Sequence, residues 1–287
     1  MRLNRRELLA GLGSISFLGY GTATASAKIS FSWKTLEKGL ELAHFLTKKK
    51  SPLGDSRITA LKINSEYYSL ELLTASGEAV AKDDNSNAHH YHTAEEWSHN
   101  DGLIAVINAG MFEPDGRNVG YMKQPGHINN GKLKKGYNAI FVTDRITEDA
   151  PLAQIIDTQD QNYEELLQKY QTASQSIRLV NSKGQRTWAR QEKMWSMAAL
   201  GMTANGEVLF FHSRSPYRVA EFIDECLSLP LNARKMMYLE GGPEASLYIN
   251  HPRAIFKGIG SYETGFNEND SNKEFWSLPN VFGVKRK

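Results

Sequence analysis

The chain has 287 residues, with 34 Lys and Arg against 32 Asp and Glu, and 40% of it is hydrophobic. This even balance leaves no broad basic face, which argues against nucleic acid or an anionic membrane surface as the main partner. Cys226 is the only cysteine, so an intramolecular disulfide and a cysteine-based metal site are excluded. A chain of this length can bury one sizeable core, and we expect a single domain.

The first 27 residues are predicted to be a cleavable twin-arginine signal peptide. Arg5-Arg6 precede a mild apolar run over 8–20, and Ala25-Ser26-Ala27 has the small residues of a cleavage site. An ordinary secretory signal is the alternative, whereas a membrane anchor would need about 20 apolar residues. We therefore expect the twin-arginine export machinery as a partner and a periplasmic or secreted protein that begins near Lys28. No stable membrane insertion is expected after the signal is removed.

Hydrophobic periodicity predicts the elements that follow. A helix is expected over 31–49, so that 28–57 would form an N-terminal helix and linker before a domain at 58–287. The alternating segments at 58–63 and 67–74 are predicted to be paired strands. Thr93 and Glu96 have the spacing of a capping box, which predicts a short helix, and an apolar strand at 103–108 comes after it.

The second half of the chain is rich in predicted strands, at 138–143, 153–157, 195–203, 207–212, 236–239, 247–249 and 279–284. Helices are expected at 163–170 and after Ser215-Pro216, and the second would bury Cys226 on its apolar face. Asn205-Gly206 and Asn129-Asn130-Gly131 predict tight turns, and 267–272 a solvated loop. Strands outnumber helices without regular alternation. The predicted class is therefore α+β, with a mixed, mostly antiparallel sheet or sheets and packed helices.

Three of the apolar strands end in glycine and polar side chains. The endings are Asn108-Ala109-Gly110-Met111-Phe112, Phe211-His212-Ser213-Arg214, and the run from Glu240-Gly241-Gly242-Pro243 through Ser246. Such endings place polar groups at the rim of a sheet, where the backbone is free to approach a ligand. Each ending alone is more often only a turn.

Taken in order, these segments resemble the phosphodiester glycosidase family over roughly residues 58–284. Further landmarks are Gln175-Ser176-Ile177-Arg178-Leu179, the strand at 198–201 and Leu239-Glu240-Gly241-Gly242. The resemblance implies an enzyme that hydrolyses glycosyl phosphodiesters. Two positions depart from the family pattern. Glu240 and Pro243 stand in a segment where much of the family has Leu-Asp-Gly-Gly-Gly-Ser, and Ser196 stands where an arginine is common.

The residues themselves are compatible with that chemistry, because splitting a sugar–phosphate bond needs anion recognition and at least one carboxylate. Glu240 is the predicted acid, base or nucleophile, with Glu244 a possible partner and Asn108 a third catalytic candidate. Ser213 to Pro216 would lie at a helix start that favours an anion. The candidate substrate- or phosphate-binding residues are Arg178, Arg214, Ser213, His212, Gly110, Gly241 and Gly242. Each has a plain alternative role in a turn, an ion pair or the interior.

No metal or other cofactor is expected. His89-His90-Tyr91-His92 has no carboxylate at a suitable spacing for one ion, and the chain has no dinucleotide fingerprint or haem motif. The leading hypothesis is an exported hydrolase that cleaves a glycosyl phosphodiester of an envelope or exopolysaccharide component. One alternative is a non-catalytic binder of glycan or phosphorylated polymer. The other is a metal-dependent phosphodiesterase, which would need Glu240 and Asn108 to hold a cation.

Overall fold

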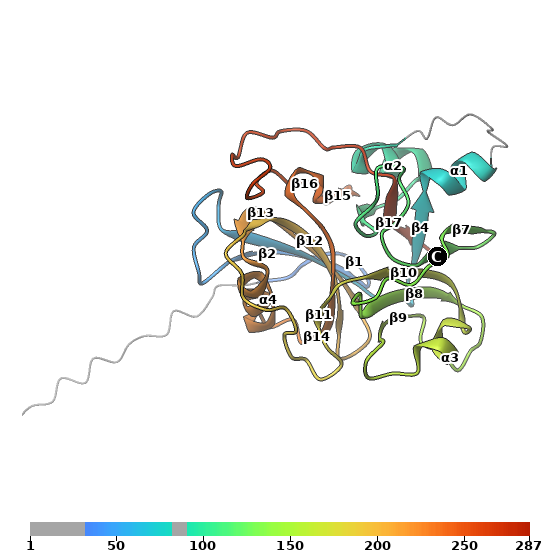
Figure 1. Ribbon diagram of the computed structural model, residues 1–287. Coiled ribbons are helices and arrows are strands. Elements are labelled where there is room, and N and C mark those ends of the chain that lie inside the picture. The colour runs from blue at the N-terminus through green and yellow to red at the C-terminus, as the bar shows by residue number, and fades with distance from the viewer. Residues whose placement is uncertain (1–31, 82–90) are drawn as a thin grey trace, which may run out of the picture. The chain divides into compact units, whose positions relative to one another are not determined.

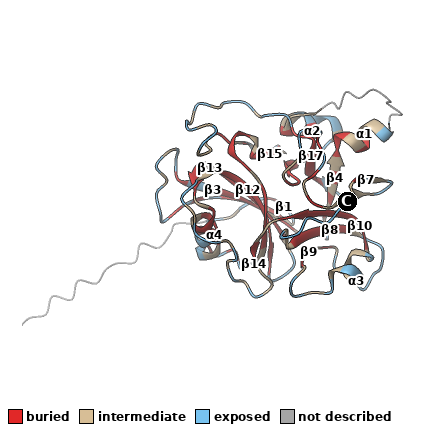
Figure 2. Ribbon diagram, viewed as in Figure 1, coloured by how far each residue is buried: buried red, intermediate tan, exposed pale blue. Residues whose placement is uncertain are grey.

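The computed structural model describes residues 32–81 and 91–287. The predicted signal peptide and the pair His89-His90 lie outside these residues. The strands form three sheets in which every pairing is antiparallel (Figure 1). Figure 2 shows that the strands are mostly buried and the connections mostly exposed. Sheet-rich α+β architecture is thus confirmed, while the described residues show no parallel pair that would make a sheet mixed.

The seven-stranded sheet has the order β1 (Lys34–Glu37), β2 (Leu40–Leu46), β3 (Arg57–Ile63), β13 (Val208–Tyr217), β12 (Trp195–Thr203), β14 (Ala233–Gly241) and β11 (Arg178–Val180). The second sheet has the order β7 (His127–Asn130), β6 (Met122–Gln124), β10 (Tyr170–Ser176), β8 (Ala139–Arg145) and β9 (Ala153–Asp157). The third has the order β16 (Ala254–Ile259), β15 (Ser246–His251), β5 (Ala105–Asn108), β17 (Asn280–Arg286) and β4 (Tyr68–Thr74).

One hydrophobic core receives side chains from all three sheets. Leu42 and Leu200 come from the seven-stranded sheet, Phe141 from the second sheet, and Ile107 and Phe282 from the third. The rings of Phe141 and Phe282 meet edge to face with their centroids 5.1 Å apart, which joins the second and third sheets. The described strands therefore share a core of the kind that one domain buries.

The helices cover outer faces of the sheets. Helix α4 (Val219–Ser228) buries Phe222 and Cys226 against the seven-stranded sheet, which confirms the predicted burial of the cysteine. Helix α2 (Ala94–Asp101) buries Trp97 against the third sheet and begins with the predicted Thr93–Glu96 capping box. The short helices α1 (Ala75–Ala81) and α3 (Tyr163–Leu167) complete the set. Among the described residues, no helix is both long and apolar enough to span a membrane.

The predicted helix over 31–49 is wrong, because this segment forms the hairpin β1–β2. Its apolar residues recur every three or four positions, as they do in a helix. The strand β2, however, is buried on both of its faces. Leu42 joins the core between the sheets, while Ala43 and Phe45 join the cluster on the opposite face under α4. A strand that is buried on both faces loses the simple alternation that distinguishes it from a helix.

The expected pairing of 58–63 with 67–74 is also wrong. Both segments are strands, but β3 pairs with β2 and β13, whereas β4 pairs with β17 near the end of the chain. Alternation reports which face of a strand is apolar and carries no information about its partner. The hairpin predicted at Asn205-Gly206 does join β12 to β13.

No helix begins at Ser215-Pro216, since β13 continues through Tyr217 and α4 begins at Val219. The Ser215 hydroxyl accepts the backbone N–H of Ser56 instead of capping a helix. Two other predicted elements differ from the structure in their position or length. Asn129 and Asn130 belong to strand β7, and the tight turn is Pro125-Gly126. The helix expected at 163–170 ends early, because β10 begins at Tyr170.

Candidate active site

Glu240 lies near the end of β14, directly after an irregularity in the strand. Ala198 of β12 is opposite Glu240 and Ala199 is opposite Tyr238, so Leu239 is an extra residue in β14. Such a bulge re-aims the side chains around it and is common beside active sites. One carboxylate oxygen of Glu240, Oε1, accepts the Gly241 N–H at 3.0 Å.

Two further carboxylates lie beside Glu240. Gly242 has a φ of 64°, and a Cβ built on it would overlap Oε2 of Glu263. The glycine therefore supplies both a left-handed backbone and the space for the Glu263 carboxylate. Glu244 is in the single turn of 3₁₀ helix, Gly242–Glu244, that follows β14. We call Glu240, Glu244 and Glu263 the carboxylate cluster.

The carboxylate cluster holds its protons unusually tightly. Burial, with a smaller contribution from the negative charges of Glu244 and Glu263, raises the pKa of Glu240 to about 8 despite the opposing effect of the Gly241 N–H. Burial also raises the pKa of Glu244, with a contribution from the charge of Glu263, and burial raises the pKa of Glu263 itself. At neutral pH the cluster therefore keeps a proton on Glu240, which makes this side chain a proton donor.

Aromatic rings surround the cluster and account for its desolvation. A Cβ on Gly241 would overlap the hydroxyl of the buried Tyr238 and would lie 2.8 Å from Nε1 of Trp195. Trp188 packs on Tyr238 with centroids 5.9 Å apart. Burial raises the pKa of Tyr137, and the charges of Glu240 and Glu113 add to this effect, which places Tyr137 close to the cluster.

Ser196 holds the segment that carries Glu263. Its hydroxyl donates to the Arg214 carbonyl at 2.6 Å and accepts the N–H groups of Ser261 and Tyr262 at 3.0 and 3.2 Å. The position where an arginine is common in the family is thus occupied by a side chain with a bracing role. Glu263 was missed by the sequence analysis, since it lies on an irregular segment with no motif around it.

Asn108 positions the loop of Glu244 and does not face a ligand. Its amide nitrogen donates to the Glu244 carbonyl at 3.0 Å, and its Oδ1 accepts the Ser246 N–H at 2.7 Å. The side chain is buried, so both of its polar atoms are used within the protein. Gly110 likewise packs against another side chain, because a Cβ on it would overlap Oδ1 of Asn118.

The two predicted anion clamps line different cavities, and the cavity of Arg178 is also lined by Gly136 and Asn138, the neighbours of Tyr137. Arg178 pairs with the buried carboxylate of Asp157 and lines a cavity of about 280 Å³ beside Trp188. Arg214 donates to the carbonyls of Ile259, Asp270 and Asn272 and pairs with the Asp270 carboxylate at 2.9 Å. Arg214 therefore fastens the 259–272 segment to the seven-stranded sheet.

His212 and Ser213 also serve the interior. Nε2 of His212 lies 3.2 Å from the Ala245 carbonyl, and burial lowers the pKa of His212 to about 4, so the ring is neutral at neutral pH. The Ser213 hydroxyl donates to the Ser215 carbonyl at 2.8 Å. His212 and Arg214 line a cavity of about 390 Å³ together with Arg57, and this is not the cavity that Arg178 lines. Neither of these two cavities is lined by Asn108 or Glu240, so the four candidate residues Asn108, Arg178, Arg214 and Glu240 do not share one of them.

A further set of basic side chains lines a separate cavity. Arg117, Lys132 and Lys134 line a cavity of about 480 Å³ together with Glu113. The Lys134 carbonyl accepts the Tyr137 N–H at 3.2 Å, so this cavity adjoins the tyrosine whose pKa responds to Glu240. Arg117 pairs with Asp115 of the same cavity at 2.6 Å, so the candidate cations for anion recognition are Lys132 and Lys134, with Arg178 in the cavity beside Trp188.

Within 32–81 and 91–287, no three His, Cys, Asp or Glu side chains are arranged to hold a metal ion. His92, from the histidine-rich segment, lies 3.4 Å from the Glu78 carboxylate and packs against Trp97. His92 therefore makes local contacts within the fold.

Comparison with known proteins agrees with this architecture. A family model described as phosphodiester glycosidase matches residues 101–285. The zebrafish N-acetylglucosamine-1-phosphodiester alpha-N-acetylglucosaminidase catalytic domain, auto-inhibited by its pro-peptide, superposes with a TM-score of 0.57 at 14% identity over 90% of this chain and 88% of that one. A hypothetical protein from Synechocystis superposes with a TM-score of 0.60 at 11% identity over 91% of this chain and 64% of the other. No curated protein matches significantly in sequence.

Proposed function

This chain belongs to the phosphodiester glycosidase family, and from that membership we propose that it hydrolyses a glycosyl phosphodiester at the carboxylate cluster. The observation that carries the proposal is Glu240, whose pKa of about 8 keeps it protonated beside two other acidic side chains at neutral pH. Glycoside hydrolysis commonly uses such a set, in which one carboxyl donates a proton and another acts as base or nucleophile.

The steps follow from the charges. Glu240 donates its proton to the departing phosphate oxygen while the bond to the sugar breaks. One of Glu244 and Glu263, acting as a carboxylate, stabilises the positive charge that develops on the sugar ring, and the same side chain can activate the attacking water. We place the phosphate toward Lys132 and Lys134, whose cavity lies beside Tyr137. The products are a free sugar and a phosphate monoester.

We further propose that the protein acts outside the cytoplasm, on an envelope or exopolysaccharide component. Arg5-Arg6, the apolar run after them and Ala25-Ser26-Ala27 support export through the twin-arginine pathway. An exported hydrolase of this family would meet glycans and phosphodiesters of the cell envelope.

The test uses the purified protein and a panel of sugar 1-phosphodiesters. We expect turnover of at least one member, activity that falls as pH rises through about 8, and a loss of about 100-fold or more in kcat for Glu240→Gln. Glu148→Gln is the matched control, because Glu148 is exposed on the β8–β9 connection, away from the cluster. Unchanged turnover in Glu240→Gln would remove Glu240 from the mechanism.

A non-catalytic glycan binder remains a second candidate because of Ser196. Its hydroxyl is fully engaged by backbone groups, so the position offers no cation to the cluster. Saturable binding of the panel without turnover would favour this function over hydrolysis.

A further inference from the structure

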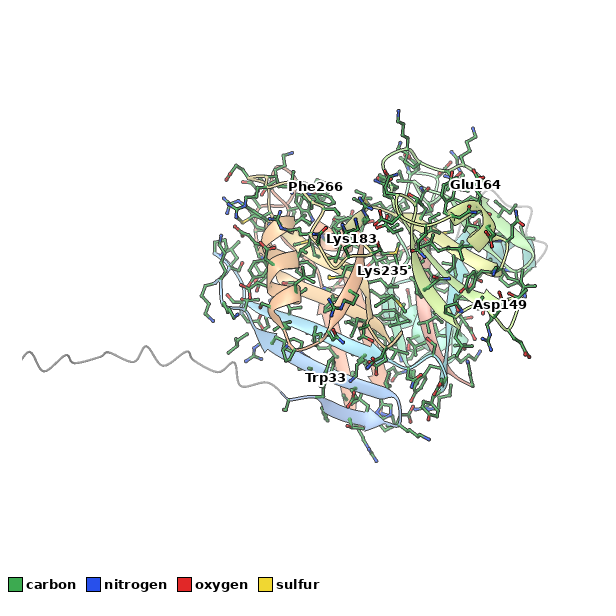
Figure 3. The ribbon with its side chains drawn as sticks, turned by 90° about the horizontal axis from the view of Figure 1, so that it is seen from below. Trp33, Asp149, Glu164, Lys183, Lys235 and Phe266 are labelled. Atoms are coloured by element: carbon green, nitrogen blue, oxygen red, sulfur yellow. The ribbon has the colours of Figure 1, made fainter. Side chains whose placement is uncertain are left out.

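Two large aromatic side chains are exposed to solvent on the segment that follows Glu263. Phe266 is 64% exposed and Trp276 is 40% exposed, and their rings meet edge to face with centroids 6.2 Å apart. Single exposed apolar residues are common on protein surfaces, but here two rings form one patch. Figure 3 shows Phe266 among the loop side chains, apart from the strands. We call Phe266 and Trp276 the aromatic pair.

The aromatic pair is tied to the cluster by a short turn. The Phe266 N–H donates to the Glu263 carbonyl at 3.2 Å, and the Asn267 N–H donates to the same carbonyl at 2.9 Å. Residues joined in such a turn have their Cα atoms within about 7 Å of each other. The backbone of Phe266 is therefore close to the backbone of Glu263, a member of the carboxylate cluster.

The segment that carries the pair is firmly fastened. The Thr264 hydroxyl donates to the Met194 carbonyl at 3.0 Å and accepts the Met194 N–H at 3.1 Å. Arg214 holds Asp270, as described above, and Leu278 is buried two residues after Trp276. The rings are thus held outward by a fixed backbone, and a bound ligand would not have to order the segment first.

The charge of the segment indicates what kind of ligand fits. Glu268, Lys273 and Glu274 are exposed near the two rings in the chain, and the segment from Glu263 to Trp276 has more acidic than basic side chains. Acidic neighbours disfavour a phosphate or another anion at this patch. A sugar ring has an apolar C–H face and a rim of hydroxyl groups, so it can pack on an aromatic face while its hydroxyls bond to carboxylates.

We propose that the aromatic pair is a binding platform for an uncharged sugar unit beyond the bond that is cleaved. This inference rests on the proposed function, and it makes the substrate an oligosaccharide or polysaccharide phosphodiester. The phosphate would lie toward Lys132 and Lys134, and the extended glycan would run past Glu263 to the two rings.

The experiment measures binding of neutral glycans, so it requires no turnover. The probes are hexaoses of glucose, mannose and N-acetylglucosamine in α- and β-linked forms, titrated by calorimetry into the purified full chain. We expect at least one hexaose to bind and the double variant Phe266→Ala/Trp276→Ala to bind it at least tenfold more weakly. Trp276→Phe, which keeps a ring, should retain most of the affinity.

Ile146→Ala is the matched control, since Ile146 is a large apolar residue that is 58% exposed on the β8–β9 connection. It should bind like the unaltered protein. Failure of every hexaose to bind, or equal binding by the double variant, would overturn the platform even if phosphodiesters are cleaved. A concentration-dependent dimer that the double variant abolishes would assign the patch to a second copy of the chain and would also overturn it.

Discussion

Glu240 connects the chemistry of the site to the stability of the fold. A carboxyl whose pKa rises from its ordinary value of 4.5 to about 8 binds its proton more tightly when the protein is folded. Between these two values the folded state holds more protons than the unfolded state, so stability falls as pH rises. His212 has the opposite sign, because its folded pKa of about 4 means that stability falls as pH drops from about 6.5 to 4.

Glu240→Gln removes the first of these effects and leaves the second. We expect the substituted protein to be more stable than the unaltered one at pH 9, by an amount that shrinks toward pH 5. The substitution removes a pH dependence of the free energy of unfolding that is at most about 1.4 kcal/mol per pH unit. Urea unfolding at pH 5, 7 and 9 measures it, with Glu148→Gln as control. If the free energies of unfolding of Glu240→Gln and of the unaltered protein change with pH in parallel, folding does not raise the pKa of Glu240.

Individual residues were predictable where their chemistry is local. Glu240 and Glu244 stand in a glycine-rich run that signals a strand end, and both belong to the cluster. Glu263 could not be found this way, because only the folded backbone brings it against Gly242. Arg214 was misassigned since a sequence does not show that its guanidinium is occupied by the 259–272 segment.

At the scale of elements, the strand β2 shows what periodicity misses. Its apolar residues face two different clusters, and the polar strand β10, with the sequence YQTASQS, gives hardly any apolar signal although most of it is buried. Elements with a one-sided pattern or a cap, such as α2 and the β12–β13 hairpin, were predictable from the chain alone.

The strand assignment of β2 predicts the effect of truncating its leucines. Leu42 is 3% exposed in the central core, whereas Leu46 of the same strand is 50% exposed. Leu42→Ala should lower the free energy of unfolding by about 2–5 kcal/mol. Leu46→Ala should change it by less than about 0.5 kcal/mol. Urea unfolding of the two variants measures the difference, and similar losses in both would contradict the burial pattern of this strand.

For the molecule as a whole, the three sheets explain why the site lies where it does. The core joins strands that are far apart in sequence, such as β4 with β17 and β3 with β13. At the site, the pairing of β12 with β14 and the bridge between Trp195 and Glu263 bring the end of β14 and the Glu263 segment together. No local pattern in the chain contains this information, so the sheet-rich class was predictable while the assembly of the site was not.

The proposed hydrolysis breaks the bond between the sugar and the phosphate oxygen. It is tested by running the hydrolysis of a cleaved panel member in water labelled with oxygen-18 and locating the label by mass spectrometry. Attack on the sugar predicts the label in the hydroxyl of the released sugar and none in the phosphate monoester. Label in the phosphate would mean that the phosphorus–oxygen bond breaks, which would contradict a glycosidase at the carboxylate cluster.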